Sequence, residues 1–174
     1  AGLTSGSGKT TVTLGLLRAM TRAGLSVCAA KSGPDYIDSA FLAAASGAPA
    51  VNLDSHAMVT AHLRQLAADS PCPMLLVEGV MGLFDGIGSS ETGSTAATAR
   101  LLDLPVLLVV DAGGQAASLG ALVRGFRDHA PNLNLAGVVL NRVSSSRHRE
   151  LLAAVLVEVD HPAVAEEDTN GTIN

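Results

Sequence analysis

Three short segments of the chain are continuously apolar instead of alternating between apolar and polar residues. They read MLLV from residue 74, VLLVV from residue 106 and LAGVVL from residue 135. A strand with this pattern is buried on both faces, so helices must cover both sides of its sheet. The pattern therefore predicts an α/β protein, a three-layer α/β/α sandwich with a mostly parallel sheet.

Segments of helix length separate these strands, which favours the same architecture. We expect strands at 25–31, 74–79, 105–111 and 135–141, and helices at 9–23, 57–68, 92–102, 115–130 and 146–156, where apolar residues recur every three or four positions. This order implies parallel strands joined by right-handed crossovers.

The length of 174 residues suits one domain, which we place at 1–157, followed by an acidic tail at 158–174. Only three residues precede the first glycine-rich segment, so we expect the domain to lack most of its first strand. The two cysteines have neither the spacing of a metal site nor the number of a disulfide framework, and we expect free, structural thiols.

Charge and hydropathy exclude two classes of partner. The net charge is −5 and no block of Lys or Arg occurs, which argues against a nucleic-acid partner. No apolar run reaches the roughly 18 residues of a membrane span, and no signal peptide precedes the domain. We therefore expect a cytoplasmic protein without a membrane partner.

The segment TSGSGKTT at residues 4–11 is typical of a loop that binds phosphate. Glycines let backbone N–H groups at a helix start approach an anion, Lys9 would reach the terminal phosphates and Thr10 would supply a hydroxyl to Mg²⁺. The strict phosphate-loop pattern fails by one position, because Gly2 stands six residues before Gly8. A Gly/Ser turn that only starts a helix is the alternative.

Acidic residues follow two of the expected strands, at the edge where parallel sheets place their ligands. Glu78 ends an apolar strand, where a carboxylate needs a partner such as Mg²⁺, and Asp85 follows in the same glycine-rich loop. A solvated strand end and an ordinary turn are the respective alternatives.

The segment KSGPDYID at residues 31–38 emerges at that same edge. Lys31 would face phosphate, Asp35 and Asp38 would hold metal, water or substrate, and Tyr36 is the only tyrosine. Asp38 is equally well explained as the N-cap of a helix that follows, and Asp54 also as a cap. Asn141 ends the last strand, where its amide could hydrogen-bond a base.

Together these segments resemble the cobyrinic acid a,c-diamide synthases, P-loop ligases grouped with dethiobiotin synthetase. The resemblance rests on TSGSGKTT, KSGPDYIDSAF, VNLDSHAM, LLVEGVMGLFDG, VVDAGG and GVVLNRVSSSRHRELL, and runs from Thr4 to Leu152. The six-residue gap between Gly2 and Gly8 also matches the loop of these ligases.

The resemblance implies amidation of the a and c carboxylates of a corrin macrocycle through an acyl phosphate, with ATP and Mg²⁺ as cofactors. It assigns the triphosphate to Ser5, Gly6, Ser7, Gly8, Lys9, Thr10 and Thr11, adenine to Asn141, and Mg²⁺ to Thr10, Glu78 and Asp35. The residues on the catalytic and substrate side would be Lys9, Lys31, Asp35, Tyr36 and Asp85.

Two departures from the family pattern concern the substrate pocket and the ammonia source. Ser39 stands where the family carries Pro, and His56 where it carries Trp. The family continues into a glutaminase domain, which we do not expect within this chain, so ammonia would come from solution or from a separate partner. A homodimer is left open.

Three other interpretations remain. One is a related tetrapyrrole amidase, of the nickel-sirohydrochlorin or cobyric acid type. Another is a partitioning-type switch ATPase, although Thr4 stands where those proteins carry an extra lysine. The third is a defective remnant whose sheet edges lack partners.

Overall fold

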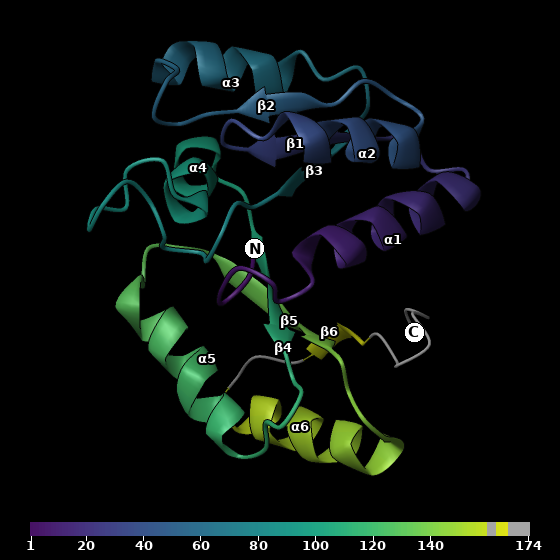
Figure 1. The fold of residues 1–174 in the computed structure, drawn as a ribbon, viewed down its shortest axis with the longest axis vertical. Coiled ribbons are helices and arrows are strands. Elements are labelled where there is room, and N and C mark those ends of the chain that lie inside the picture. The colour runs from purple at the N-terminus through teal and green to yellow at the C-terminus, as the bar shows by residue number, and fades with distance from the viewer. Residues whose placement is uncertain (160–162, 167–174) are drawn as a thin grey trace. The chain divides into compact units, whose positions relative to one another are not determined.

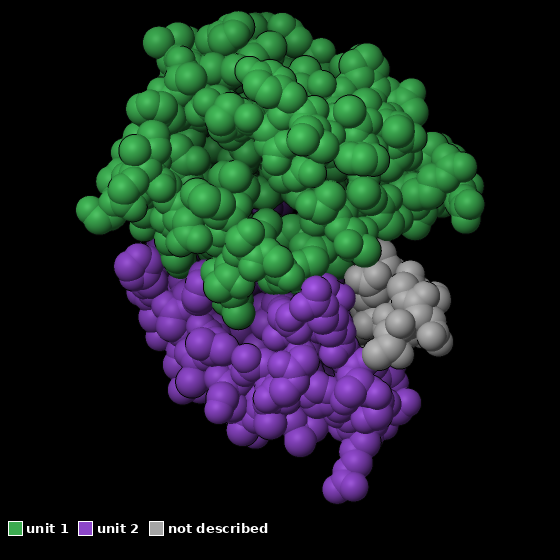
Figure 2. Space-filling view, in the orientation of Figure 1, with its two compact units in different colours: residues 1–104 green, residues 105–174 purple. Residues whose placement is uncertain are grey.

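The structure is a computed structural model that describes residues 1–159 and 163–166. The chain forms two compact units, residues 1–104 and residues 105–174, which Figure 2 shows in different colours. Over the described residues each unit contains one three-stranded sheet, in the orders β2-β1-β3 and β4-β5-β6. Every described pairing is parallel, as the continuously apolar segments predict.

The first unit carries four helices around its sheet in the described residues (Figure 1). Its elements are α1 (Lys9–Arg22), β1 (Val27–Ser32), α2 (Tyr36–Ser46), β2 (Val51–Leu53), α3 (Thr60–Ala68), β3 (Met74–Glu78) and α4 (Thr95–Leu102). In the register of the central strand, Lys31 lies beside Asn52 on β2 and beside Glu78 on β3.

Two apolar clusters cover opposite faces of this sheet, because successive side chains of a strand alternate between its faces. One cluster joins α1 and α2 to β1 through Leu17, Leu42, Val27 and Ala29, with Leu76 of β3 packed against it. The other joins β2 and α3 to β1 through Leu53, Leu63 and Ala30, with Leu75, Val77 and Leu102 packed against it. The unit thus has three layers.

This alternation places the two residues that end β1 on opposite faces. Lys31 is two residues after Ala29 and lies on the α1 side, together with its register neighbour Glu78. Ser32 is two residues after Ala30 and lies on the α3 and α4 side. Lys31, Ser32 and Glu78 are all buried.

Several elements differ from the sequence-based expectation. β1 begins at Val27, since Leu25 is half exposed in the turn that follows α1. The expected helix at 57–68 begins at Thr60, because residues 54–58 form a turn closed by the Met58 N–H donating to the Asp54 carbonyl. β2 was not expected, and three residues are too few to give a periodic signal.

The expectation of free thiols is wrong, because Cys28 and Cys72 form a disulfide. Cys28 lies on β1 opposite Leu75 of β3, and Cys72 lies just before β3 begins. The strand register therefore brings together two cysteines that are 44 residues apart in sequence. The disulfide fastens the segment that enters β3 to the central strand.

The second unit consists of β4 (Val106–Asp111), α5 (Ser118–His129), β5 (Leu135–Asn141), α6 (Ser146–Glu158) and β6 (Ala163–Glu166) (Figure 1). A Cβ on Gly120 of α5 would lie 2.9 Å from Cγ1 of Val155, so this glycine lets α5 and α6 approach closely. β6 pairs with β5 within the segment expected to be an acidic tail. Glu158 of that segment ends α6, and residues 160–162 and 167–174 lie outside the described residues.

Within the described part of the chain, none of the helices has both the length and the apolar character needed to span a membrane.

Candidate functional site

The glycine-rich loop leads directly into α1, as the phosphate-binding interpretation requires. Gly6 and Gly8 have φ values of 79° and 91°, which favour glycine. Gly8 is the N-cap of α1, and no side chain among the described residues caps this helix start. Lys9 Nζ donates to the carbonyl of Thr4 at 3.0 Å, and Ser7 Oγ donates to the same oxygen at 3.0 Å. The helix start therefore offers backbone N–H groups to an anion.

Gly2 explains the six-residue gap before Gly8. A Cβ at this position would lie 2.3 Å from Oγ of Ser7 and 3.0 Å from Cδ of Lys9, so any other residue would disturb the loop. The carbonyl of Gly2 accepts a hydrogen bond of 2.8 Å from the Leu83 N–H, which ties this segment to the chain that follows β3. The loop conformation thus depends on glycine here.

Lys31, Glu78 and Thr10 meet at the carboxyl end of the first sheet. Lys31 Nζ donates to Oε1 of Glu78 at 3.0 Å and to Oδ2 of Asp38 at 2.5 Å. The hydroxyl of Thr10 donates to the same Oε1 at 2.5 Å. The side chains of Lys31 and Glu78 are only 4% and 1% exposed. The structure therefore brings together a lysine, two carboxylates and the first turn of α1.

The two lysines of the site have opposite pKa shifts, and they are the only lysines of the chain. Burial lowers the pKa of Lys31, but its hydrogen bonds to Asp38 and Glu78 outweigh burial, so the pKa lies above its ordinary value. Burial lowers the pKa of Lys9, and the positive charge of Lys31 lowers it further. The carboxylates thus hold Lys31 as a cation.

The second oxygen of Glu78, Oε2, is buried and accepts no hydrogen bond from the described residues. Burying such an oxygen destabilises the fold unless a cation binds it or a donor hydrogen-bonds to it. Mg²⁺ fits this position, because it prefers oxygen ligands and takes most of them from phosphates and water. The described residues contain no group of three or more His, Cys, Asp or Glu that could hold a metal by itself.

The loop after β1 places Asp35, not Asp38, at the start of a helix. Oδ1 of Asp35 accepts from the N–H groups of Ile37 and Asp38, both at 3.1 Å, and α2 begins at Tyr36. The interpretation of Asp38 as the N-cap is therefore wrong, since its carboxylate pairs with Lys31. The hydrogen bond from the Asp38 N–H lowers the pKa of Asp35. Oδ2 of Asp35 lies 4.0 Å from Lys31 Nζ.

Tyr36 is highly exposed at the first position of α2, with 81% of its surface accessible. Ile37 and Phe41 are also exposed on this helix. Asp85 accepts a hydrogen bond of 2.8 Å from the Gly82 N–H through Oδ2, so it holds a turn within its own loop. Of the remaining loop residues, Ser5, Gly6 and Thr11 are exposed.

Asn141 lies in the second unit, at the end of β5 opposite Asp111 of β4. It is buried, and the next residue, Arg142, has a left-handed backbone with φ 60°. The guanidinium of Arg142 donates to Asp111, whose other oxygen accepts from the Gly113 N–H at 2.9 Å. Nε2 of His148 lies 2.8 Å from the Gln115 carbonyl. These contacts fix the two loops that flank Asn141.

Sequence reasoning missed three hydroxyl residues beneath the site, Ser32, Thr95 and Thr98. All three are buried, at 0%, 8% and 1% exposure. The spacing of Thr95 and Thr98 puts both hydroxyls on one face of α4, and this spacing is visible in the sequence. Nothing in the sequence shows that this face packs against the ends of β1 and β3.

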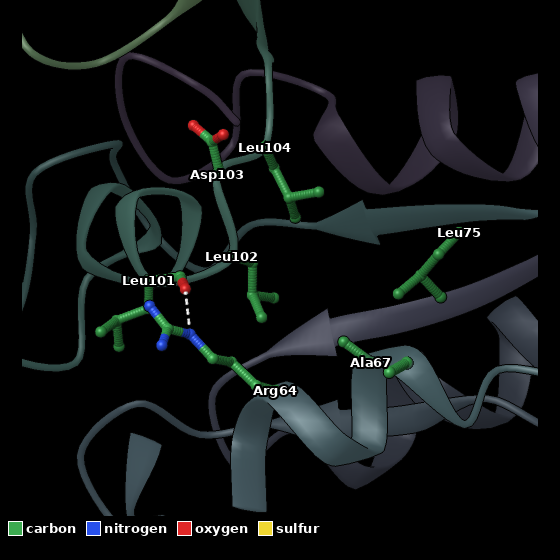
Figure 3. Close-up of a pocket in the computed structure, with 8 residues that line it drawn as sticks. Arg64, Ala67, Leu75, Leu101, Leu102, Asp103 and Leu104 are labelled. Carbon is green, nitrogen blue, oxygen red and sulfur yellow. Dashed lines mark hydrogen bonds between the residues drawn. The ribbon is translucent and has the colours of Figure 1, made fainter. Parts of the chain in front are cut away.

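The first unit also contains a largely apolar pocket of about 410 Å³ between α3, β3 and the end of α4 (Figure 3). Its lining consists of Arg64, Ala67, Ala68, Leu75, Leu101, Leu102, Asp103 and Leu104. At its rim, Arg64 Nε donates to the Leu101 carbonyl at 3.0 Å. None of the candidate site residues lines this pocket.

Comparison with known proteins gives a family match over most of the chain. The model of the family described as the CobQ/CobB/MinD/ParA nucleotide binding domain matches residues 1–166. The hydrogenobyrinate a,c-diamide synthase of Mesorhizobium japonicum is 49% identical over 98% of the chain, and the cobyrinate a,c-diamide synthase of Syntrophotalea carbinolica is 47% identical over 93%. The chain spans 40% and 36% of the lengths of these relatives.

Solved structures with similar folds share little sequence with the chain. Chloroplast FtsY from Physcomitrella patens has a TM-score of 0.68 at 19% identity, covering 95% of this chain and 56% of that one. The signal recognition particle 54 kDa protein from Aeropyrum pernix, in complex with GDP, has a TM-score of 0.65 at 18% identity. The match covers 98% of this chain and 41% of that one. These likenesses show a P-loop NTPase fold and agree with the expected fold class.

Proposed function

Because the chain belongs to the CobQ/CobB/MinD/ParA nucleotide binding domain family, we propose that it is the ATP-dependent part of a hydrogenobyrinate or cobyrinate a,c-diamide synthase. The observation that carries the proposal is the meeting of Lys31, Glu78 and Thr10 beside the glycine-rich loop. The names of relatives that are 47% to 49% identical supply the substrate class, a corrin macrocycle with free side-chain carboxylates.

The phosphates of ATP are assigned to the loop at residues 5–11. Backbone N–H groups at the start of α1 would hold oxygens of the triphosphate, and Lys9 would exchange its bond to the Thr4 carbonyl for one to phosphate. Asn141 is assigned to the adenine base, since its amide can donate and accept together.

Mg²⁺ is assigned to Thr10 and to Oε2 of Glu78, with Asp35 Oδ2 on the substrate side. When bound, Mg²⁺ would neutralise charge on the phosphates during transfer. Since Thr10 and Lys31 both donate to Oε1 of Glu78, they orient the carboxylate and leave Oε2 for the metal.

The proposed reaction joins a carboxylate to ammonia in two steps. A carboxylate oxygen of the corrin attacks the γ-phosphorus, and the bond to ADP breaks as an acyl phosphate forms. Ammonia then attacks the acyl carbon, loses a proton and expels phosphate, which leaves the amide. Lys9 and Lys31 would stabilise the negative charge that gathers between phosphate and carboxylate.

The substrate side is assigned to Tyr36, Asp35 and Asp85. Tyr36 is exposed at the start of α2, where an aromatic ring can contact a flat macrocycle. Asp35 and Asp85 would position the carboxylate or the incoming ammonia, which would come from free ammonium or from a glutaminase domain or subunit.

Mass spectrometry tests the proposal directly. The purified protein is incubated with hydrogenobyrinic or cobyrinic acid, ATP, Mg²⁺ and an ammonium salt, with Lys9→Ala as the control. We expect conversion of one or two carboxylates to amides, and loss of conversion in the control. A folded protein that binds ATP but converts neither acid would overturn the assignment of substrate.

A further inference from the structure

The N-terminal end of α4 buries two threonine hydroxyls, those of Thr95 and Thr98. Threonine is a weaker helix former than alanine, and a buried hydroxyl destabilises the fold unless it is hydrogen-bonded. Thr95 and Thr98 lie three residues apart on one face of the helix, 8% and 1% exposed. Both hydroxyls form hydrogen bonds to the chain near the ends of β1 and β3.

Thr95 fixes the chain immediately beyond Glu78. Its Oγ1 accepts from the Val80 N–H at 3.0 Å and donates to the Val80 carbonyl at 3.1 Å. A Cβ on Gly79 would lie 2.6 Å from this Oγ1, so glycine is needed for the approach. Thr95 therefore holds the end of β3 through both backbone groups of one residue.

Thr98 fixes the end of β1 and the turn after β2. Its Oγ1 lies 3.1 Å from Oγ of Ser32, which follows Lys31, and 3.2 Å from Oγ of Ser55. Its third neighbour is the carbonyl of Ser94, at 3.3 Å. A hydroxyl has one proton to donate, so Thr98 accepts from Ser32 and donates to Ser55 or Ser94.

We propose that Thr95 and Thr98 are positioning residues. They lie on the opposite face of the sheet and set the distance between Lys31 and Glu78. Lys31 and Glu78 are register neighbours 3.0 Å apart on the α1 side, and the two threonines hold the next one or two residues of each strand on the α4 side. Small movements of either strand end would change the Lys31–Glu78 contact, because both side chains are buried against packed neighbours.

The test compares Thr95→Val and Thr98→Val with Thr98→Ser, which keeps the hydroxyl. The matched control is Thr21→Val on α1, because among the described residues the Thr21 hydroxyl bonds only to backbone carbonyls, those of Leu17 at 2.7 Å and Ser46 at 3.5 Å. If Thr98→Val does not fold, Thr98→Ala takes its place. Urea denaturation of every variant measures the purely structural effect.

The first readout needs no ligand. Protein labelled with ¹⁵N-lysine has two side-chain ammonium groups, and Lys9→Ala assigns the signal of Lys31. We expect the Lys31 signal to shift in Thr95→Val and Thr98→Val and to stay unchanged in Thr98→Ser and Thr21→Val. An unchanged Lys31 signal in both threonine-to-valine variants at the site would overturn the proposal.

The second readout rests on the function proposed above. Calorimetry measures ATP affinity with and without Mg²⁺, and we expect the gain from Mg²⁺ to fall about tenfold or more in Thr95→Val and Thr98→Val. A gain that stays at the wild-type value in both variants would also overturn the proposal. If the wild-type protein binds no ATP, the proposed function fails, and the Lys31 signal alone decides the positioning role.

Discussion

The ammonium nitrogen of Lys31 lies 3.0 Å from Oε1 of Glu78, and the two residues are register neighbours on β1 and β3. The two partners are not equally dependent on each other. Lys31 has a second carboxylate, Asp38, at 2.5 Å, whereas Glu78 has one further donor, the hydroxyl of Thr10, also at 2.5 Å. Loss of Glu78 therefore leaves Lys31 paired with a carboxylate, whereas loss of Lys31 leaves Glu78 with a neutral hydroxyl as its hydrogen-bond donor.

Lys31→Met should destabilise the protein by about 3–5 kcal/mol, because it removes the lysine that is hydrogen-bonded to the buried carboxylate of Glu78. Glu78→Gln should cost less, since Lys31 keeps Asp38. Urea denaturation at neutral pH measures both. Arg18→Met is the control, because Arg18 is exposed on α1 and its loss should change stability by no more than about 0.5 kcal/mol. Equal losses in the two site variants would contradict the asymmetry.

Asp35 should make the protein less stable in acid. Its pKa is lowered from 3.8, mainly by the Asp38 N–H, so its contribution is present above pH 3.8 and is lost as pH falls through the folded-state pKa. The effect is small, since 37% of the side chain is exposed to screening solvent.

Asp35→Asn should keep the helix cap but lose this pH dependence. Asp35→Ala should lose the cap at every pH, at about 1 kcal/mol. Thermal unfolding at neutral pH and below pH 3.8 separates the two roles. A wild-type protein whose acid sensitivity equals that of Asp35→Asn would refute the charge contribution.

Reduction of the Cys28–Cys72 disulfide should lower the free energy of unfolding. A cross-link between residues 44 apart restricts the unfolded chain, and loop-closure entropy gives about 4 kcal/mol as the upper expectation. Urea denaturation with and without a dithiol reductant measures the difference. Cys28→Ala/Cys72→Ala should be insensitive to reductant, and a wild-type protein with the same insensitivity would show that the thiols are free.

Two glycine-to-alanine substitutions should change the free energy of unfolding in opposite directions. Gly79→Ala would put a Cβ 2.6 Å from Thr95 Oγ1 and should destabilise by roughly 1–3 kcal/mol. Gly125→Ala lies within α5, where a Cβ would meet nothing within 4 Å, and should stabilise by about 0.5–1 kcal/mol. Thermal unfolding compares the pair, and a neutral Gly79→Ala would show that Thr95 does not approach this closely.

The sequence predicts those features that depend on local pattern. The continuously apolar segments predict parallel strands, and both the α1 start at Lys9 and the positions of Lys31 and Glu78 at strand ends follow from the motifs. The pairing of Cys28 with Cys72 was not predictable, because it depends on β1 and β3 being neighbours in register. Asp35 and Asp38 both suit a helix start, and only the position of Lys31 decides which carboxylate is free to pair with it.

The end of β1 leaves no freedom to add or remove a residue. A deletion before Lys31 would move Lys31 into the place of Ala30, so that its ammonium group faces Leu53 and Leu63, and would put the Ser32 hydroxyl opposite Glu78. An insertion before Lys31 would move its ammonium group to the same face and put Ala30 opposite Glu78. A change in the length of β1 would therefore separate Lys31 from Glu78, whereas the loops beyond the strand ends can change length without turning Lys31 to the other face of the sheet.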